Sequence, residues 1–440
     1  MPTVVRPGRR RHGSLHHWAA RAAALLTCIL AATSALILVP TSAQAHPLST
    51  TAVLLDVGAD EVTGQLQLPI DRLAIALDQP LTAAVVRQPA KLEELRHYVL
   101  AHVWAKADSA SWTVSVSNGR VESIDNVDHL VFDLVLRPPT GTVRDFQFHD
   151  DAIVHRLLSH RILVSSREAG AGDYTAVGVI DWQSSTLTVP ARGATARQGF
   201  LAAVHLGIRH IAEGADHLLF LIMLLLPAPL LARRGRWLRT DDLRRNSWRV
   251  VHVVTAFAIG HSITLALAAF GFVSAPSRVV ESLIALSILI SGLHAIRPLA
   301  RGGELWIAAG FGLMHGLAFA ALLGPLDLSH GSLVTELLGF NLGIELTQLI
   351  VVALIMPSLM VLSRTPIYPV VRTALAGAGV VLAAAWLAER TTLISANPLE
   401  GISVALVAHP FSVAATLALT AAITWALPYR RRAPSPNAQT

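Results

Sequence analysis

Ionisable side chains recur inside the long apolar stretches that follow Phe200. Such groups cost several kcal/mol in the core of a bilayer and normally face a cavity, a partner or an ion path. Helical spacing groups them further, because residues at i, i+3 or i+4, and i+7 share one face of a helix. Two sets have this spacing, His210, Glu213 and His217 in one stretch and Asn341, Glu345 and Gln348 in another.

Four polar groups also fall at one depth of the expected bilayer. His217, His261 and His315 lie near the middle of their apolar stretches, and Glu345 lies a third to half of the way along its own. Imidazole nitrogens combined with a carboxylate suit Ni²⁺, Co²⁺, Zn²⁺ or Cu²⁺, and ligand type does not choose among these ions. The residues therefore indicate metal or proton handling at mid-membrane. The alternative is a hydrogen-bonded network that only specifies helix packing.

The composition places these stretches in a membrane protein. The 440 residues are 53% hydrophobic and 15% charged, with a mean hydropathy of +0.52, whereas soluble domains carry about 25% charged residues. The net charge of +6 does not indicate binding of nucleic acid, because the arginines form short runs between apolar stretches and no recognition motif accompanies them. The single cysteine, Cys28, lies in the N-terminal apolar run, so we expect no disulfide.

The first 190 residues have the features of an export signal followed by a soluble domain. Residues 1–45 have a basic start, an apolar core and an Ala-Gln-Ala cleavage site, which predicts a signal peptide; an uncleaved anchor helix is the alternative. Cleavage would leave His46 at the N-terminus, where its amine and imidazole can chelate a metal ion. Residues 46–190 alternate as strands do, with one helical period at 91–106, so we expect an extracytoplasmic β-rich, sandwich-like domain. The predicted strands are 51–57, 62–68, 112–116, 130–136 and 176–189, with a hairpin turn at 58–61.

About 20 apolar residues cross a bilayer, and the sequence has seven stretches of roughly this length. After a linker at 191–202, they predict a membrane all-α helical bundle of about seven transmembrane helices at 203–427, followed by a tail at 428–440. Seven arginines between Arg233 and Arg249 mark the first loop as cytoplasmic, which places the soluble domain outside and the tail inside. Gly312 and Gly316, next to the histidine of the fourth stretch, permit close helix approach. The predicted spans are 203–231, 250–272, 279–296, 305–323, 334–361, 368–388 and 402–427.

Five segments within about residues 205–352 together resemble the HupE/UreJ family of bacterial membrane proteins. In order they are HIAEGADHLLFLIMLLL, VTAFAIGHSITLAL, ESLIALSI, FGLMHGLAFA and FNLGIELTQL. The resemblance implies a divalent-metal permease or accessory protein in the plasma (inner) membrane of a bacterium, with nickel or cobalt as the metal. It also implies that His210, Asp216 and His217 form the family's metal motif, a His, five residues, then Asp-His. The family's second, His-Gly-rich motif ends in Glu in some members, and here it contains His315 without that Glu.

The residues and the resemblance together lead to three hypotheses. The first is a permease, not an enzyme, whose substrate is a divalent transition metal, nickel or cobalt before zinc or copper. Its partners are the metal ion, the lipid bilayer and an extracytoplasmic protein or metal donor for the outer domain. The second is a seven-helix zinc-dependent intramembrane hydrolase, and the third is a non-transporting metal sensor or assembly partner. The predicted metal ligands are His210, Asp216, His217, His261, His315 and Glu345, and the predicted accessory or proton-relay residues are Glu213, Glu281, Asn341, Gln348 and His46.

Overall fold

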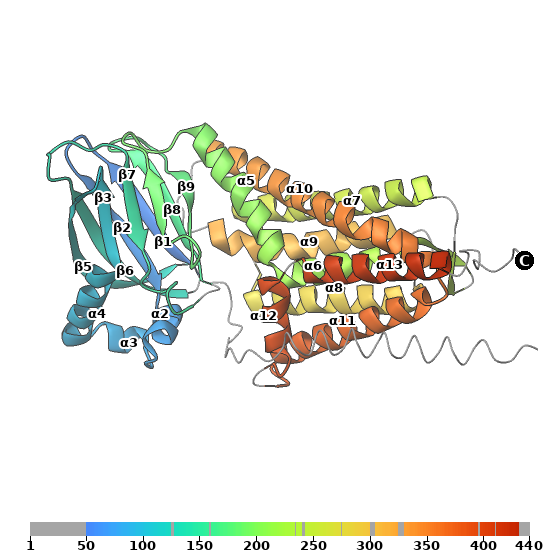
Figure 1. Cartoon of the computed structure of the whole chain (residues 1–440). Helices are drawn as coiled ribbons and strands as arrows, with labels where there is room; N and C mark the ends of the chain where they lie inside the picture. The colour runs from blue at the N-terminus through green and yellow to red at the C-terminus, as the bar shows by residue number, and fades with distance from the viewer. Residues whose placement is uncertain are drawn as a thin grey trace, which may run out of the picture.

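A sheet-rich domain and a bundle of helices lie end to end in the computed structural model of the protein (Figure 1). The structure describes residues 50–430, with gaps at 125–126, 158–159, 234, 240–242, 274, 300–303, 324–329, 395–396 and 410. The predicted signal segment, His46 and residues 431–440 of the predicted tail lie outside the described residues.

Two sheets build the N-terminal domain around one hydrophobic core. The first has the strand order β5-β6-β2-β1-β8-β9 and the second has the order β10-β7-β3-β4. Phe132 of the first sheet and Phe146 and Phe148 of the second belong to the same buried cluster, as expected for sheets packed face to face. The prediction of a sheet-rich N-terminal region is therefore confirmed. The strands are β1 (Thr51–Val57), β2 (Val62–Pro69), β3 (Val103–Ala107), β4 (Ala110–Ser111), β5 (Thr113–Ile124), β6 (Val127–Arg137), β7 (Phe146–Asp150), β8 (Ile162–Glu168), β9 (Thr175–Ile180) and β10 (Thr186–Val189).

Local sequence explains the first hairpin but misplaces the end of one helix. The predicted turn joins β1 to β2, with the Gly58 N–H donating to the Glu61 carbonyl at 3.0 Å. The helix predicted at 91–106 is α4 (Pro89–His102), and it ends earlier because Val103 pairs with Asp150 in the β3–β7 ladder. Two further helices, α2 (Ile70–Leu77) and α3 (Ala83–Val86), lie with α4 at one end of the sheets (Figure 1).

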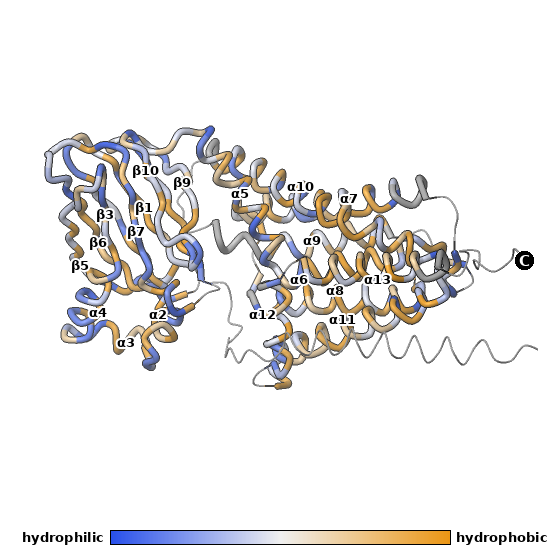
Figure 2. The backbone as a smooth tube through the Cα atoms, viewed as in Figure 1, coloured by the Kyte–Doolittle hydropathy of each residue, from blue (hydrophilic) through white to orange (hydrophobic). Residues whose placement is uncertain are grey.

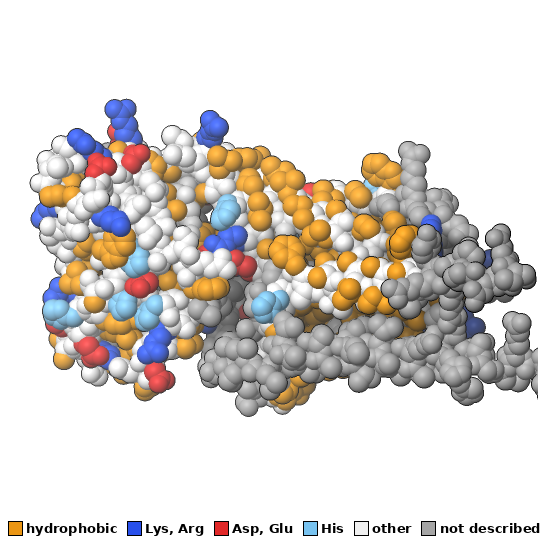
Figure 3. All heavy atoms as spheres, in the orientation of Figure 1, with side chains coloured by type: hydrophobic (Ala, Val, Ile, Leu, Met, Phe, Trp, Pro, Cys, Tyr) orange, Lys and Arg blue, Asp and Glu red, His pale blue; other side chains and the backbone are white. Residues whose placement is uncertain are grey.

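Apolar helices run along the long axis of the C-terminal bundle. Figure 2 shows these helices as mainly hydrophobic, and Figure 3 shows many hydrophobic side chains on their described surface. Large apolar residues such as Leu338 and Val381 are more than half exposed on its surface, as a bilayer would require. A short hairpin of β11 (Leu230–Arg233) and β12 (Arg236–Arg239) follows the second helix. The helices are α5 (Ala196–Glu213), α6 (Ala215–Leu225), α7 (Leu243–Ala269), α8 (Ser277–Ile296), α9 (Glu304–Leu323), α10 (His330–Ser363), α11 (Tyr368–Arg390), α12 (Glu400–Ala408) and α13 (Ser412–Arg430).

Among the described residues, four helices are long and apolar enough to cross a membrane, so membrane helices are supported while seven spans stay a prediction. These four segments are Trp248–Ala269, Arg278–Ile296, Leu333–Ser363 and Tyr368–Arg390. Shorter apolar segments lie at Ala215–Leu225, Leu305–Leu317 and Ser412–Ala426.

Two predicted spans are not continuous helices. The first, 203–231, breaks at Gly214, whose extended backbone (φ −83°, ψ 100°) separates α5 from α6. The last, 402–427, breaks after α12 at His409, which precedes a proline in the sequence and so disfavours helical geometry. The helix α5 also begins inside the predicted linker, at a Thr195 capping box with Gln198.

Candidate metal site in the helical bundle

Glycines bring the backbones of α7 and α9 into direct contact beside two histidines. A Cβ atom on Gly312 would lie 2.1 Å from the Phe257 carbonyl oxygen, and one on Gly316 would lie 2.3 Å from the carbonyl oxygen of His261. Only glycine fits such an approach, so the predicted role of these two glycines is confirmed. The close packing holds His261 of α7 near His315 of α9, and both are buried, at 0% and 1% exposure.

The helix break at Gly214 brings two more histidines together. His210 lies in the last turn of α5 and His217 in the first turns of α6, so they do not share one continuous helix face as predicted. Their rings nevertheless lie 4.5 Å apart between centroids, because the chain changes direction between them. Both side chains are at least nine-tenths buried.

The four histidines form one cluster, which we call the bundle histidine cluster (His210, His217, His261 and His315). Between ring centroids, His217 lies 5.2 Å from His315 and 6.3 Å from His261, and His210 lies 6.3 Å from His261. Phenylalanine rings surround the cluster at 5.2 to 5.5 Å from its members and make its environment apolar: they are Phe220, Phe257 and Phe340.

Hydrogen bonds fix which ring nitrogens can bind a metal. The Nδ1 of His315 donates to the Phe311 carbonyl at 2.9 Å, and the Nδ1 of His217 donates to the Asp216 carboxylate at 2.9 Å. In a neutral imidazole the other nitrogen then carries the lone pair. The Nε2 atoms of His217 and His315 and both ring nitrogens of His261 are buried without a hydrogen-bond partner among the described residues. In His217 and His315, one ring nitrogen is held by a carboxylate or a carbonyl, as is common for histidines that bind a metal; His261 has no such acceptor among the described residues.

The rings lie at the right separation, but their nitrogens do not yet point at one centre. Within the described ranges, no group of three or more histidine, cysteine or carboxylate side chains is gathered closely enough to hold a metal ion. Imidazoles that share a metal at about 2.0–2.1 Å have ring centroids roughly 4.5–6 Å apart. Because the observed centroids span about this range, rotation of the rings, rather than movement of the helices, would bring the nitrogens together.

The two carboxylates predicted as ligands occupy different positions. Asp216 is part of the cluster's hydrogen bonding: its Oδ1 accepts from both the backbone N–H and the Nδ1 of His217, at 2.9 Å each. Glu345 accepts from the hydroxyl of Thr255 at 2.9 Å. Thr255 lies six residues before His261 on α7, about 9 Å along the helix axis. Glu345 therefore lies level with Thr255, closer to the start of α7 than His261 is.

The accessory residues predicted from the sequence are mostly engaged elsewhere. Glu213 pairs with two arginines at the junction with the N-terminal domain, and Glu281 pairs with Arg390 of α11 at 2.7 Å. Asn341 donates to a carbonyl of its own helix at 2.9 Å. Gln348 is 3% exposed, and its Oε1 has no partner in the described part of the chain. His46 lies outside that part.

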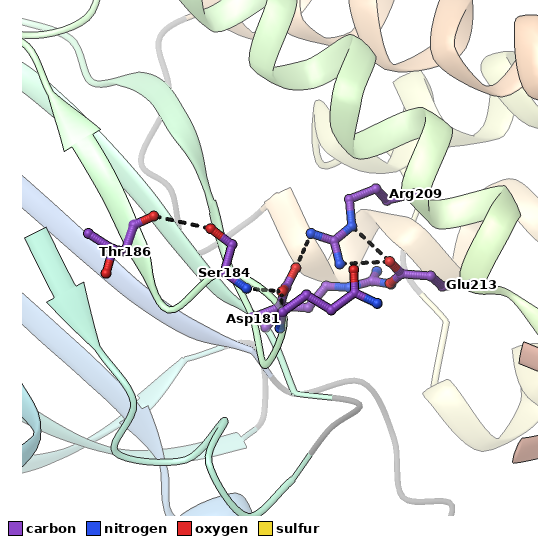
Figure 4. A network of polar contacts seen from close by, with 7 residues as sticks. Asp181, Ser184, Thr186, Arg209 and Glu213 are labelled. Atoms are coloured by element: carbon purple, nitrogen blue, oxygen red, sulfur yellow. Dashed lines mark hydrogen bonds and ion pairs between the residues drawn. The ribbon is translucent and has the colours of Figure 1, made fainter. Parts of the chain in front are cut away.

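An ion-pair network that the sequence did not predict joins the two parts of the protein (Figure 4). Arg209 of α5 pairs with Asp181, which follows β9 and is 2% exposed, and with Glu213 at 2.7 Å. Arg161 of the N-terminal domain also pairs with Glu213, at 2.5 Å. A second link is the carboxylate of Glu336 in α10, which accepts from the backbone N–H of Ala176 in β9 at 2.9 Å. These contacts join the N-terminal domain to α5 and α10.

A comparison with known protein families matches one segment, which runs from the end of the N-terminal domain through most of the helical bundle. Residues 184–390 match the family model described as HupE / UreJ protein. This range contains the bundle histidine cluster, Asp216 and Glu345. No curated protein matches the chain.

Proposed function

We propose, from the premise that residues 184–390 of this chain belong to the HupE/UreJ family, that the protein is a membrane permease or accessory protein for a divalent transition-metal ion. The family is associated with transport of nickel and cobalt, and these two ions are the proposed substrates. The ion binds at the bundle histidine cluster.

The observation that carries the proposal is the set of buried imidazole nitrogens without partners. A polar atom in an apolar interior costs free energy unless it is paired, and His217, His261 and His315 come from three helices to such a place. A purely structural network would use those nitrogens in hydrogen bonds among the described residues. A ligand role for a passing metal ion supplies the missing partner.

The broken first span adds a second line of support. Transporters often bind their substrates where a membrane helix is interrupted near the bilayer midplane, and the α5–α6 break at Gly214 lies between His210 and His217. We propose that the ion arrives from the side of the outer domain and leaves past Glu345 toward the arginine-rich loop. In this topology the outer domain lies outside the inner membrane of a bacterium, the bundle has seven spans, and the tail is cytoplasmic.

Metal uptake by cells that express the protein tests this proposal. We expect accumulation of nickel or cobalt with the wild-type protein and loss of accumulation with His261→Ala. His252→Ala is the matched control, because His252 is an exposed histidine on the same helix, nine residues earlier. Equal metal accumulation by His261→Ala and wild type would refute the proposal. So would the absence of accumulation above empty vector for all four ions: nickel, cobalt, zinc and copper.

Transport is proposed in preference to the hydrolase alternative. Ser262, a residue that such a hydrolase would use beside the histidines, donates its hydroxyl to the Ala258 carbonyl at 2.7 Å. This bond within its own helix supports a packing role for Ser262. Turnover of a lipid amide or ester by the purified protein with bound zinc would favour the hydrolase instead.

A further inference from the structure

A second group of histidines lies on the outer domain, and strand pairing builds it. In the β3–β7 ladder, Val103 pairs with Asp150 and Trp104 with His149. The pairing continues one step beyond the strand, where the Asp151 N–H donates to the His102 carbonyl at 3.3 Å. Since alternate residues of a strand share a face, His102, Trp104, His149 and Asp151 all point outward on one side of the sheet.

A turn after β7 adds one more histidine to this surface. The ring of His155 stacks on the ring of His102, with 4.7 Å between centroids and 18° between planes. We call His102, His149, Asp151 and His155 the outer-domain histidine patch. Aromatic neighbours frame it, since Trp104 stacks on His149 at 4.6 Å and Tyr98 lies 4.5 Å from His102.

One aspartate orients the two stacked imidazoles. The Nδ1 of His102 donates to the Asp151 carboxylate at 2.7 Å, and the Nδ1 of His155 donates to the Asp151 backbone carbonyl at 2.6 Å. The Nε2 atom of each neutral ring therefore carries the lone pair. Carboxylate and carbonyl acceptors on Nδ1 are typical of histidines that bind a metal through Nε2.

We propose that the outer-domain histidine patch binds a divalent transition-metal ion through Nε2 of His102 and His155. The two ring centroids lie 4.7 Å apart, but the rings stack within 18° of parallel, so both Nε2 lone pairs reach one ion only after a ring turns. The exposed His155 is the ring that turns. His149, whose Nε2 lies 3.6 Å from the Asp151 carboxylate, is the third imidazole within reach. The described residues do not hold three ligands in place beforehand, so water and a rotated ring complete the coordination.

The surroundings suit the capture of a free metal ion. The side chains of His102, His149 and Asp151 are 23%, 13% and 31% exposed, and His155 is exposed, so solvent reaches the patch. Figure 3 shows histidine and acidic side chains gathered on this face of the outer domain. The cation of Lys106 is held over the ring of Trp104, 4.7 Å from its centroid. With two or three neutral ligands and an open face, the patch binds and releases the ion readily.

Such a site gives the outer domain a role beyond the proposed transport. It collects the metal ion on the extracytoplasmic side and raises its concentration near the bundle to which the domain is fixed. The existence of the patch as a metal site does not depend on transport, although its use in supply rests on the proposed function.

Equilibrium dialysis of the purified full-length protein against Ni²⁺ alone tests the proposal. We expect two ions per wild-type chain, one at the patch and one at the bundle histidine cluster. The double variant His102→Gln, His155→Gln keeps a side-chain donor near Asp151 but has no imidazole, and it should bind one ion fewer. The matched control is His97→Ala, because His97 is an exposed histidine of the same helix that contacts Glu93.

The outcomes separate the patch from the bundle site. If the double variant binds as much Ni²⁺ as wild type with the same affinity, or if His97→Ala loses the same ion, the patch proposal is overturned. If the double variant loses one ion while His261→Ala loses none, the patch is supported and the proposed bundle site fails. A visible absorption band of bound Co²⁺ that weakens in the double variant and not in His97→Ala would identify imidazole ligation at the patch.

Discussion

Replacing Asp216 by Asn separates a metal ligand from a residue that positions one. The Asp216 Oδ1 accepts two hydrogen bonds from His217, one from the backbone N–H and one from the ring Nδ1. Asn keeps an oxygen in the same place and so keeps both bonds, but it removes the negative charge. If Asp216 only holds the His217 ring, the variant should still bind metal, with lower affinity.

The expected magnitude follows from that role. Loss of an outer partner of a metal-binding histidine costs about 10- to 100-fold in affinity, or roughly 1.4–2.8 kcal/mol at 1.4 kcal/mol per factor of ten. Asp216→Ala should lie at or beyond the weak end of this range, because it also removes both hydrogen bonds. His217→Ala should lose more than either, since it deletes a nitrogen ligand.

Calorimetric titration of the purified variants with Ni²⁺ measures these affinities. Glu281→Gln is the control for charge removal, because Glu281 is paired with Arg390 and contacts no histidine of the cluster in the described structure. If Asp216→Asn abolishes binding as completely as His217→Ala, the carboxylate is itself a ligand and the positioning argument is wrong. If Asp216→Asn binds like wild type, the hydrogen bond to His217 has no part in metal affinity.

Three further predictions concern packing, docking and pH. Gly312→Ala should abolish metal uptake, because the new Cβ would lie 2.1 Å from a carbonyl oxygen of α7. Gly310→Ala is the control and should leave uptake unchanged, because among the described residues no packing neighbour lies within 4 Å of its Cβ position. Equal uptake by the two variants would contradict this prediction. Arg209→Ala removes the cation paired with the buried carboxylate of Asp181, which keeps its two backbone N–H bonds. This loss should cost about 3 kcal/mol and speed tryptic cleavage between the two parts; an unchanged cleavage rate would oppose it. Burial lowers the pKa of His160 to about 3, below its value of about 6.5 in the unfolded chain. The folding stability linked to this neutral imidazole is therefore fully present above pH 6.5 and is lost as the pH falls toward 3. Thermal unfolding should show about 1 kcal/mol of this loss at pH 5.5, and His160→Gln should remove that part of the pH dependence; equal slopes would refute the assignment.

In the N-terminal domain, local sequence predicted which strands and helices form better than it predicted where they end. The alternation at 51–57 and 62–68 gave β1 and β2 because a hairpin needs only neighbouring residues and a turn. The helical period at 91–106 failed at Val103, whose conformation is set by pairing with Asp150, 47 residues later. Residue periodicity carries no information about such a distant partner.

In the bundle, too, local sequence predicted some features of the candidate site, and distant contacts decided others. Depth along the apolar stretches grouped His217, His261 and His315, whose rings do lie close together, because an α-helix converts residue number into position across the bundle. The same argument also placed Glu345 at this level, whereas Glu345 bonds Thr255, about 9 Å along α7 from His261. The spacing of His210 and His217 suggested one face of a straight helix, but a single glycine conformation broke that helix. Helical spacing therefore predicted that His210 and His217 lie close together, but for a partly wrong reason.

By itself, the sequence determined that this chain has apolar membrane helices after a sheet-rich region, and that buried histidines share one level of the bundle. These properties follow from hydropathy and helical rise, which are local. Only the tertiary structure decided that Asp216 holds His217, that Glu345 bonds Thr255 about 9 Å along α7 from His261, and that Glu213 joins the N-terminal domain. It also assembled the outer-domain histidine patch, because strand register brings His102 and Asp151 together across 49 residues.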